Sequence, residues 1–166
     1  NDALGRIKTM PPTPHRQEII KTSAGITIID DTYNSNPAGF SSALELLKNI
    51  PAQRRILVTP GMIELGEKQF ELNKNAAKTA AQVADYVIIV GETNKKAIKE
   101  GLKEGLKEKF NLPSRTSDLE DTYEGNEYNK RVFEVIDLEA AKSKLSELVI
   151  ANSAVLLEND LPDHYF

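Results

Sequence analysis

Hydrophobic and polar positions follow a repeating order along most of the chain. Short apolar runs are each followed by a polar loop and then by a longer segment whose apolar residues recur every three or four positions. Runs that are apolar on both faces are typical of buried parallel strands, and the longer segments are typical of amphipathic helices. The pattern therefore predicts a series of strand, loop and helix units.

These elements can be located by residue number. Residues 16–22 and 26–30 predict two strands joined by a turn at 23–25, so the sheet begins as an antiparallel hairpin. We expect further strands at 55–59, 86–90, 132–136 and 154–158, and helices at about 37–50, 68–83, from 93, and 138–148. The order predicts an α/β fold, with an open, mostly parallel sheet, an antiparallel first strand and helices on both faces.

Two segments refine this outline. Asn36 and Pro37 have the residue types preferred at the N-cap and first position of a helix, and they precede the first helical pattern. Residues 111–131 are polar and contain Pro and Gly, which predicts a loop or a mobile insertion. Strands of the sheet are therefore expected both before and after this insertion in the sequence.

A polar motif follows the second predicted strand. Residues 30–37 read DDTYNSNP, and ligands of open α/β sheets bind outside the carboxyl ends of the strands. Carboxylates accept hydrogen bonds and carboxamides both donate and accept, so this motif could hold the vicinal hydroxyls of a sugar and the edge of a base. On the alternative interpretation, the aspartates only end the strand and Asn36 only caps the helix. Both interpretations stay open on these residues alone.

Composition narrows the class of protein. The chain has 166 residues, 40% of them hydrophobic and 28% charged, which is typical of one soluble domain, and no apolar run is long enough for a membrane span. The 21 basic and 25 acidic residues are interspersed, with a net charge of -4, so no basic stripe predicts nucleic-acid binding. The absence of cysteine excludes disulfides and thiol nucleophiles, and fits a reducing compartment.

Other candidate sites are weaker. Residues 61–68 read GMIELGEK and nearly match a phosphate-binding P-loop, but Glu67 stands where the lysine should be and Gln69 where a hydroxyl would hold magnesium. His15 and His164 have no ligand-like spacing around them, so we predict no metal site. Arg16 has a fork of donors that could pair with a phosphate, although on sequence alone an ordinary surface arginine is the more common case.

Two motifs together resemble a known family. IIDDTYNSNPAGFSSALELL, at 28–47, resembles the signature that begins the C-terminal domain of the Mur ligases. The resemblance is strongest to the branch that adds D-alanyl-D-alanine to the peptidoglycan precursor, whose usual form is Asp-Asp-Ser-Tyr-Asn-Ala-Asn-Pro. PGMIELGE, at 60–67, resembles the second signature of that branch, Gly-Asp-Met-Leu-Glu-Leu-Gly-Glu. The resemblance covers roughly 14–91 well, and from 104 onward it rests on the order of strands and helices.

This resemblance implies a function for the domain. Mur ligases have a domain for the UDP-linked precursor, a central ATPase domain with a P-loop, and a Rossmann-like C-terminal domain that closes over ATP and receives the incoming amino acid or dipeptide. Residues 1–13 would then be a linker from a missing central domain and 14–166 the C-terminal domain. The partners implied are a UDP-linked muropeptide, the amine and the two missing domains. The expected setting is the cytoplasm, with neither nucleic acid nor a membrane span involved.

The resemblance also implies roles for single residues. Arg16 would reach the ATP phosphates and Asp31 the ribose, while Asp30 would orient the loop. The nucleotide site would comprise Arg16, Asp31, Asn34 and Asn36, and the site for the incoming substrate would comprise Tyr33, Asn34, Glu158 and Asn159. Magnesium would be bound mainly by the missing central domain. No catalytic residue is expected in this fragment alone, so the fragment should not turn over ATP by itself.

Several positions depart from the family pattern. Pro60-Gly61-Met62 replaces the usual Gly-Asp-Met, and a histidine common in the following helix is absent, with Asn73 and Asn75 nearby. The last strand ends in Glu158-Asn159-Asp160, where many members have a Lys-Gly-Ser-like stretch that helps to bind the acceptor. The identity of the incoming amine therefore stays open. A non-catalytic nucleotide-binding or interaction module of the same fold is the alternative function.

Overall fold

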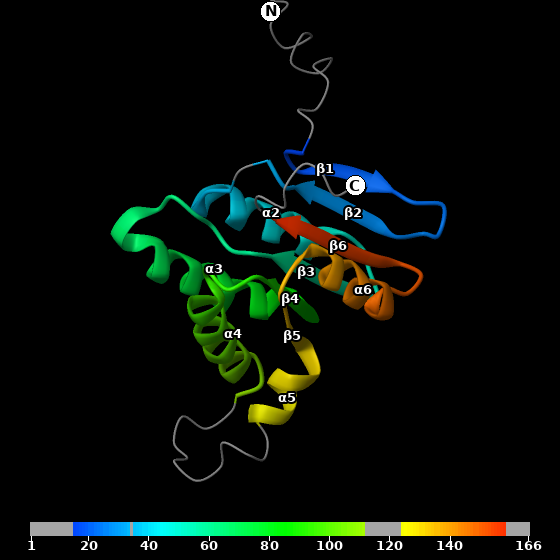
Figure 1. Ribbon diagram of the computed structural model, residues 1–166. Helices are drawn as coiled ribbons and strands as arrows, with labels where there is room; N and C mark the ends of the chain where they lie inside the picture. Colours follow the sequence, from blue (N-terminus) through cyan, green and yellow to red (C-terminus); the bar gives the residue numbers. More distant parts are fainter. Residues whose placement is uncertain (1–14, 34, 112–123, 159–166) are drawn as a thin grey trace, which may run out of the picture.

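A computed structural model describes residues 15–33, 35–111 and 124–158, with the side chains of 124–126 left out. Its six strands form one sheet (Figure 1). The strands are β1 (Glu18–Lys21), β2 (Thr27–Asp31), β3 (Arg54–Thr59), β4 (Tyr86–Val90), β5 (Val132–Val135) and β6 (Ser153–Glu158). Their order across the sheet is β1-β2-β6-β3-β4-β5, so the last strand lies between β2 and β3.

Strand direction confirms the predicted topology. β1 pairs with β2 antiparallel, and the pairs β2–β6, β6–β3, β3–β4 and β4–β5 are all parallel. Five strands therefore end at the same edge of the sheet. Every residue of β6 is buried, as expected for the central strand of a sheet covered on both faces.

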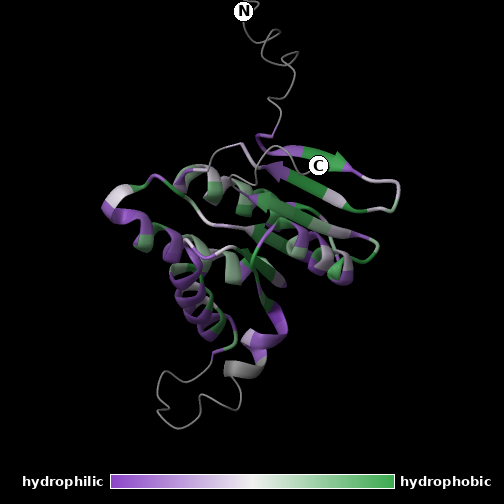
Figure 2. Ribbon diagram, in the orientation of Figure 1, coloured by the Kyte–Doolittle hydropathy of each residue, from purple (hydrophilic) through white to green (hydrophobic). Residues whose placement is uncertain are grey.

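Helices cover both faces, as predicted. They are α2 (Pro37–Asn49), α3 (Gln69–Val83), α4 (Lys95–Lys109), α5 (Glu124–Arg131) and α6 (Leu138–Leu148), with a short 3-10 turn η1 (Gly66–Lys68) before α3. One core cluster joins side chains of α2, α3, α4 and α5 to one face of the sheet, and a second cluster joins α6 to the other face. Most strand residues are accordingly hydrophobic in Figure 2, while the helices mix hydrophilic and hydrophobic residues.

Helices α3 and α4 pack against each other unusually closely. Gly101 and Gly105 of α4 face α3, where a Cβ atom on Gly101 would lie 2.0 Å from the carbonyl oxygen of Lys74. Ion pairs flank the contact, with Nζ of Lys74 lying 2.7 Å from Glu104. The two glycines therefore let the helix backbones approach to a distance that no larger residue permits.

Part of the predicted loop at 111–131 is helical. Residues 112–123 lie outside the described residues, but α5 follows them, and its Tyr128 belongs to the main core cluster. Nε of Arg131 lies 3.1 Å from Glu127 one turn earlier in the same helix. The prediction missed this helix because Tyr128 is its only large apolar residue. Among the described residues, no helix has the length and apolar character needed to cross a membrane.

Candidate functional site

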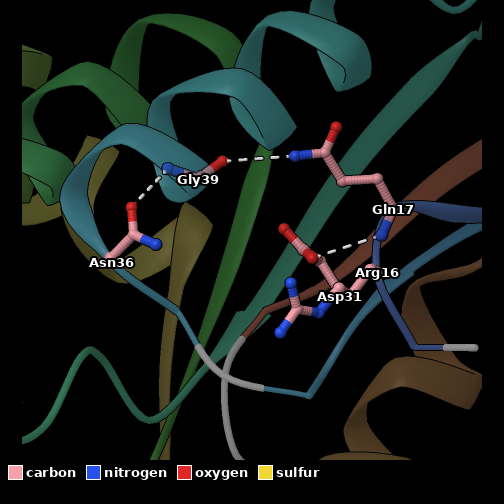
Figure 3. Close-up of a pocket in the computed structure, with 5 residues that line it drawn as sticks. All are labelled: Arg16, Gln17, Asp31, Asn36 and Gly39. Carbon is pink, nitrogen blue, oxygen red and sulfur yellow. Dashed lines mark hydrogen bonds between the residues drawn. The ribbon is translucent and has the colours of Figure 1, made fainter. Parts of the chain in front are cut away.

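A cavity of about 340 Å³ lies beside the end of β2 (Figure 3). Its size is within the range of small-molecule sites. It is lined by Arg16 and Gln17 just before β1, Asp31 at the end of β2, and Asn36 and Gly39 at the N-cap and in the first turn of α2. Three of the residues predicted to bind nucleotide, Arg16, Asp31 and Asn36, therefore meet around one cavity.

Asp30 and Asp31 make different contacts, because successive side chains of a strand point to opposite faces of the sheet. Asp30 turns away from the cavity and accepts hydrogen bonds from the backbone and hydroxyl of Thr32, at 3.2 and 2.7 Å. Its second oxygen lies 2.8 Å from Nδ1 of His15. Asp30 thus joins the start of the loop to the segment before β1, which fits the orienting role expected for it.

Asp31 turns toward the cavity and is almost completely buried. Its Oδ1 accepts a hydrogen bond of 3.2 Å from the backbone nitrogen of Gln17. Burial raises the pKa of Asp31 above its usual value, and the hydrogen bonds from Gln17 oppose that rise. The carboxyl group is therefore fixed in place but less acidic than a surface aspartate.

Arg16 is presented by an unusual backbone. The residues on either side of it, His15 and Gln17, have φ values of 59° and 49°, in the left-handed region that such residues rarely adopt. Tyr33 holds this bend because its backbone nitrogen donates to the carbonyl of His15 at 3.1 Å. The guanidinium carbon of Arg16 lies 4.7 Å from the centroid of the Tyr33 ring. The strained bend therefore places a cation at the mouth of the cavity.

Asn36 is the N-cap of α2, with Pro37 following it as predicted. Its Oδ1 accepts a hydrogen bond of 2.9 Å from the backbone nitrogen of Gly39, which leaves the amide nitrogen as its other polar group. In Figure 3 this nitrogen points toward the side of the cavity that holds Asp31. The cap interpretation is thus confirmed, and a contact with ligand stays compatible with it.

Glu158 lies beneath the motif and is fully buried, with an exposed fraction of 0%. Its Oε1 accepts a hydrogen bond from the hydroxyl of Ser35, and its Oε2 has no hydrogen-bond partner among the described residues. Asp31 is its partner in the β2–β6 register. Burial, and then the charge of Asp31, raise the pKa of Glu158 to about 8, although the bond from Ser35 acts in the opposite direction.

The second signature is held by a buried amide network. Asn73 accepts from the backbone nitrogen of Met62 at 2.7 Å and donates to its carbonyl at 2.9 Å, while Asn94 donates to the carbonyls of Pro60 and Met62. Gly61, with φ of 79°, leaves no room for a side chain, since a Cβ would lie 2.6 Å from Oδ1 of Asn73. Its backbone nitrogen donates to Thr59. The backbone nitrogens of Gly61 and Met62 are thus bonded within the domain, whereas a P-loop uses its backbone nitrogens to bind phosphate.

The structure places most of the predicted site residues. Tyr33 is exposed beside Arg16, and Glu158 is buried under the loop. Asn34 and Asn159 lie outside the described residues, so their roles stay predictions. The sequence analysis did not predict a structural role for Gln17, Ser35, Asn73 or Asn94. No apolar or charge pattern marks these residues. Only Gln17 and Ser35 lie next to residues of the predicted site, and that is the one signal that could have identified them. Within 15–33, 35–111 and 124–158, no group of three or more acidic or histidine side chains could hold a metal ion.

A family model now accounts for this arrangement. The model described as the Mur ligase, glutamate ligase domain matches residues 15–158. The chain belongs to the Mur ligase C-terminal domain family. The match runs from the bend that carries Arg16 to the buried Glu158, so this Mur ligase domain includes every described residue of the cavity.

Individual relatives agree with the family. The UDP-N-acetylmuramoyl-tripeptide--D-alanyl-D-alanine ligase of Bacillus subtilis is 32% identical over 74 residues, which cover 44% of this chain and 16% of the relative. The enzyme of the same name from Buchnera aphidicola is 33% identical over 97 residues, covering 58% of this chain and 21% of the relative. This Mur ligase domain thus spans about a fifth of their length.

Solved structures share the fold. The MurF ligase of Thermotoga maritima, in complex with ADP, superposes with a TM-score of 0.65 at 22% identity, covering 92% of this chain and 29% of that one. MurF of Acinetobacter baumannii gives a TM-score of 0.68 at 17% identity, covering 95% of this chain and 29% of that one. At these identities the likeness establishes the fold of the Mur ligase domain.

Proposed function

We propose that this chain acts as the C-terminal domain of an ATP-dependent amide ligase of peptidoglycan precursor synthesis in the cytoplasm. Family membership supports the reaction class, and the relatives' names support a UDP-linked muropeptide and D-alanyl-D-alanine as substrates. Because the chain spans about a fifth of those relatives, the activity belongs to a full-length protein that also supplies the central and N-terminal domains. The isolated chain is expected to be inactive.

The observation that carries this proposal is the cavity formed by Arg16, Asp31 and Asn36. Asp31 presents a carboxylate that can accept hydrogen bonds from the two hydroxyls of a ribose. Arg16 presents a planar fork of donors that can pair with phosphate oxygens. A carboxylate and an arginine that line one small cavity supply the groups that a nucleotide's ribose and phosphates require.

This domain contributes position and charge to the reaction. ATP, when bound, supplies the phosphoryl group that activates a carboxylate for attack by an amine. Phosphoryl transfer depends mainly on positioning and on stabilisation of charge, so Arg16 and Asp31 would act by fixing the nucleotide as the domain closes. Magnesium would be held mainly by the central domain, since the described residues of this chain offer no group of ligands for it.

The incoming amine would lie near the exposed side of the motif. Tyr33 is exposed there with Arg16 over its ring, and in the sequence Asn34 follows Tyr33 and Asn159 follows Glu158. We assign Tyr33, Asn34 and Asn159 to the amine site, whereas Glu158 at the end of β6 is fully buried and would act there only through its neighbours. The choice between an amino acid and a dipeptide follows from the relatives' names, which favour D-alanyl-D-alanine.

The test is an amide-ligation assay on the full-length protein that carries this chain. ADP release is followed with a UDP-linked tripeptide and D-alanyl-D-alanine for the wild type and Asp31→Asn, which keeps the side-chain size but removes the charge. We expect release to need both substrates and the KM for ATP to rise about tenfold or more in the variant, as for loss of a charged hydrogen-bond acceptor.

Asp137→Asn is the matched control, because Asp137 caps α6 away from the cavity and asparagine also caps helices well. It should keep the wild-type KM. Absence of ligation by the wild type with any amino acid or dipeptide would reject the ligase function and favour the interaction module. Ligation with an unchanged KM in Asp31→Asn would reject the cavity as the nucleotide site.

A further inference from the structure

The end of β6 carries a buried acid whose environment disfavours its charge. Glu158 has no exposed surface, and its carboxyl group meets a hydroxyl from Ser35 and a second carboxyl group from Asp31. No lysine, arginine or histidine pairs with it among the described residues. A buried carboxylate without a cation is strongly disfavoured, and two adjacent carboxylates are more so.

The surrounding elements add no compensating charge. From β2 the group that faces Glu158 is Asp31, while Asp30 turns to the other side of the same strand. Helix α2 packs on β6, but it has no acidic residue in its first turn, and its basic residue Lys48 lies in its last turn. Arg16 lies over the ring of Tyr33 at the mouth of the cavity. Asp31 is thus the one titratable group in the described part of the chain that acts on Glu158.

The two carboxyl groups are placed to share one proton. Asp31 and Glu158 are register partners on adjacent parallel strands, so their side chains leave the sheet on the same face. Asp31 is the partner that keeps the charge, because it accepts a hydrogen bond from the backbone of Gln17. Glu158 keeps the proton, because Oε2 is buried and accepts no hydrogen bond from any described residue. The raised pKa of Glu158 favours the same protonated form.

We propose that Glu158 is a positioning residue which, as a neutral acid, ties Asp31 and Ser35 to the end of β6 and so holds the carboxylate of Asp31 toward the nucleotide cavity. When Oε2 is protonated it can donate to the neighbouring carboxylate of Asp31, while Oε1 accepts from Ser35. Asp31 and Ser35, the two residues contacted, lie near the start and toward the end of the motif at 30–37. The role rests on the proposed nucleotide function of the cavity.

Loss of the proton should weaken the site. Ionised Glu158 cannot donate to Asp31, and the two negative charges then repel each other across neighbouring strands. The binding-competent position of Asp31 becomes less populated, so the apparent affinity for nucleotide falls in proportion. Because Glu158 does not itself touch the nucleotide, the rate at saturating ATP should stay nearly constant.

The experiment measures the KM for ATP and kcat of the full-length protein from pH 6 to 9.5. In the wild type, KM should stay flat to about pH 7 and then rise, approaching about tenfold per pH unit above the pKa of about 8, while kcat changes less than about threefold. Glu158→Gln keeps a neutral donor and acceptor, so its KM should match the low-pH wild type and stay flat. Glu158→Leu should have a raised KM at every pH.

Glu147→Gln, an exposed acid on α6, is the matched control and should keep the wild-type pH profile. An alkaline rise of KM in Glu158→Gln equal to that of the wild type would overturn the proposal, as would an unchanged KM in Glu158→Leu. A wild type that does not use ATP at any pH would instead reject the proposed function, so the two failures are distinguishable.

Discussion

The contact between α3 and α4 sets two physical effects against each other at Gly101. Alanine is a better helix former than glycine by about 1 kcal/mol, so on propensity alone Gly101→Ala should stabilise the domain. The added Cβ, however, would lie 2.0 Å from the carbonyl oxygen of Lys74 and 2.9 Å from the Cβ of Ala77. The first of these atoms belongs to the backbone of α3, so it cannot rotate away as a side chain could.

We expect the cost of the clash to exceed the gain in helix propensity. Relief of the clash requires the helices to separate, which also disturbs the neighbouring contact of Gly105 with Lys78 and Ala81. Overpacking of this kind costs about 1 to 3 kcal/mol and sometimes more, and a contact this short belongs at the upper end. After the gain in propensity, we expect a net loss of about 2 kcal/mol in the free energy of unfolding. For a domain of this size that lowers Tm by about 4 to 8 °C.

Thermal and urea unfolding of Gly101→Ala and the wild type would measure the difference. Gly39→Ala is the control, since it makes the same change within a helix but its Cβ would have no neighbour nearer than 3.6 Å. We expect the control to be as stable as the wild type or more stable by up to about 1 kcal/mol, because its gain in helix propensity meets no clash. A Gly101→Ala protein at least as stable as the wild type would refute the packing argument, because propensity would then outweigh the clash.

Two further predictions concern buried polar groups. Asn73→Leu leaves the backbone nitrogen of Met62 without its acceptor, while the carbonyl of Met62 keeps its hydrogen bond from Asn94. The unsatisfied nitrogen should cost about 1 to 3 kcal/mol of stability, and Asn75→Leu on the same helix is the control in urea unfolding. The carboxyl of Glu158 has an ordinary pKa of 4.5 when unfolded and one raised by burial to about 8 when folded. The folded state therefore binds more protons between these values, so the free energy of unfolding should fall with rising pH across this window, by at most about 1.4 kcal/mol per unit. Denaturation of Glu158→Gln should lack this slope, and an equal slope in both proteins would contradict the assigned protonation.

Sequence patterns predicted the elements whose signal is local and apolar. The strands at 86–90 and 154–158 have long apolar runs, and Asn36-Pro37 marks the start of α2, so each was located within a residue or two. Helix α5 was missed because its helical contacts are ion pairs and a single tyrosine. Local patterns predict poorly where an element is stabilised mainly by distant contacts.

In the candidate site, too, some residues could be predicted from the sequence and others could not. Arg16, Asp31 and Asn36 were predicted because their motif resembles a family, and the structure brings all three to one cavity. The burial of Glu158 could not be predicted, since a carboxylate at the end of a strand is usually exposed, and its partner Ser35 is 123 residues away in sequence. Only the folded sheet brings them together.

The position of β6 has a consequence for synthesis of the protein. Strands β2 and β3 are joined only through β6, which comes last among the strands described. Until Ser153–Glu158 leave the ribosome, the hairpin and the β3–β4–β5 ladder each expose an unpaired strand edge, and such edges promote aggregation. A chain stalled or cut before Ser153 therefore loses the middle of its sheet, and it becomes a substrate for chaperones or proteases even though most of its residues are present.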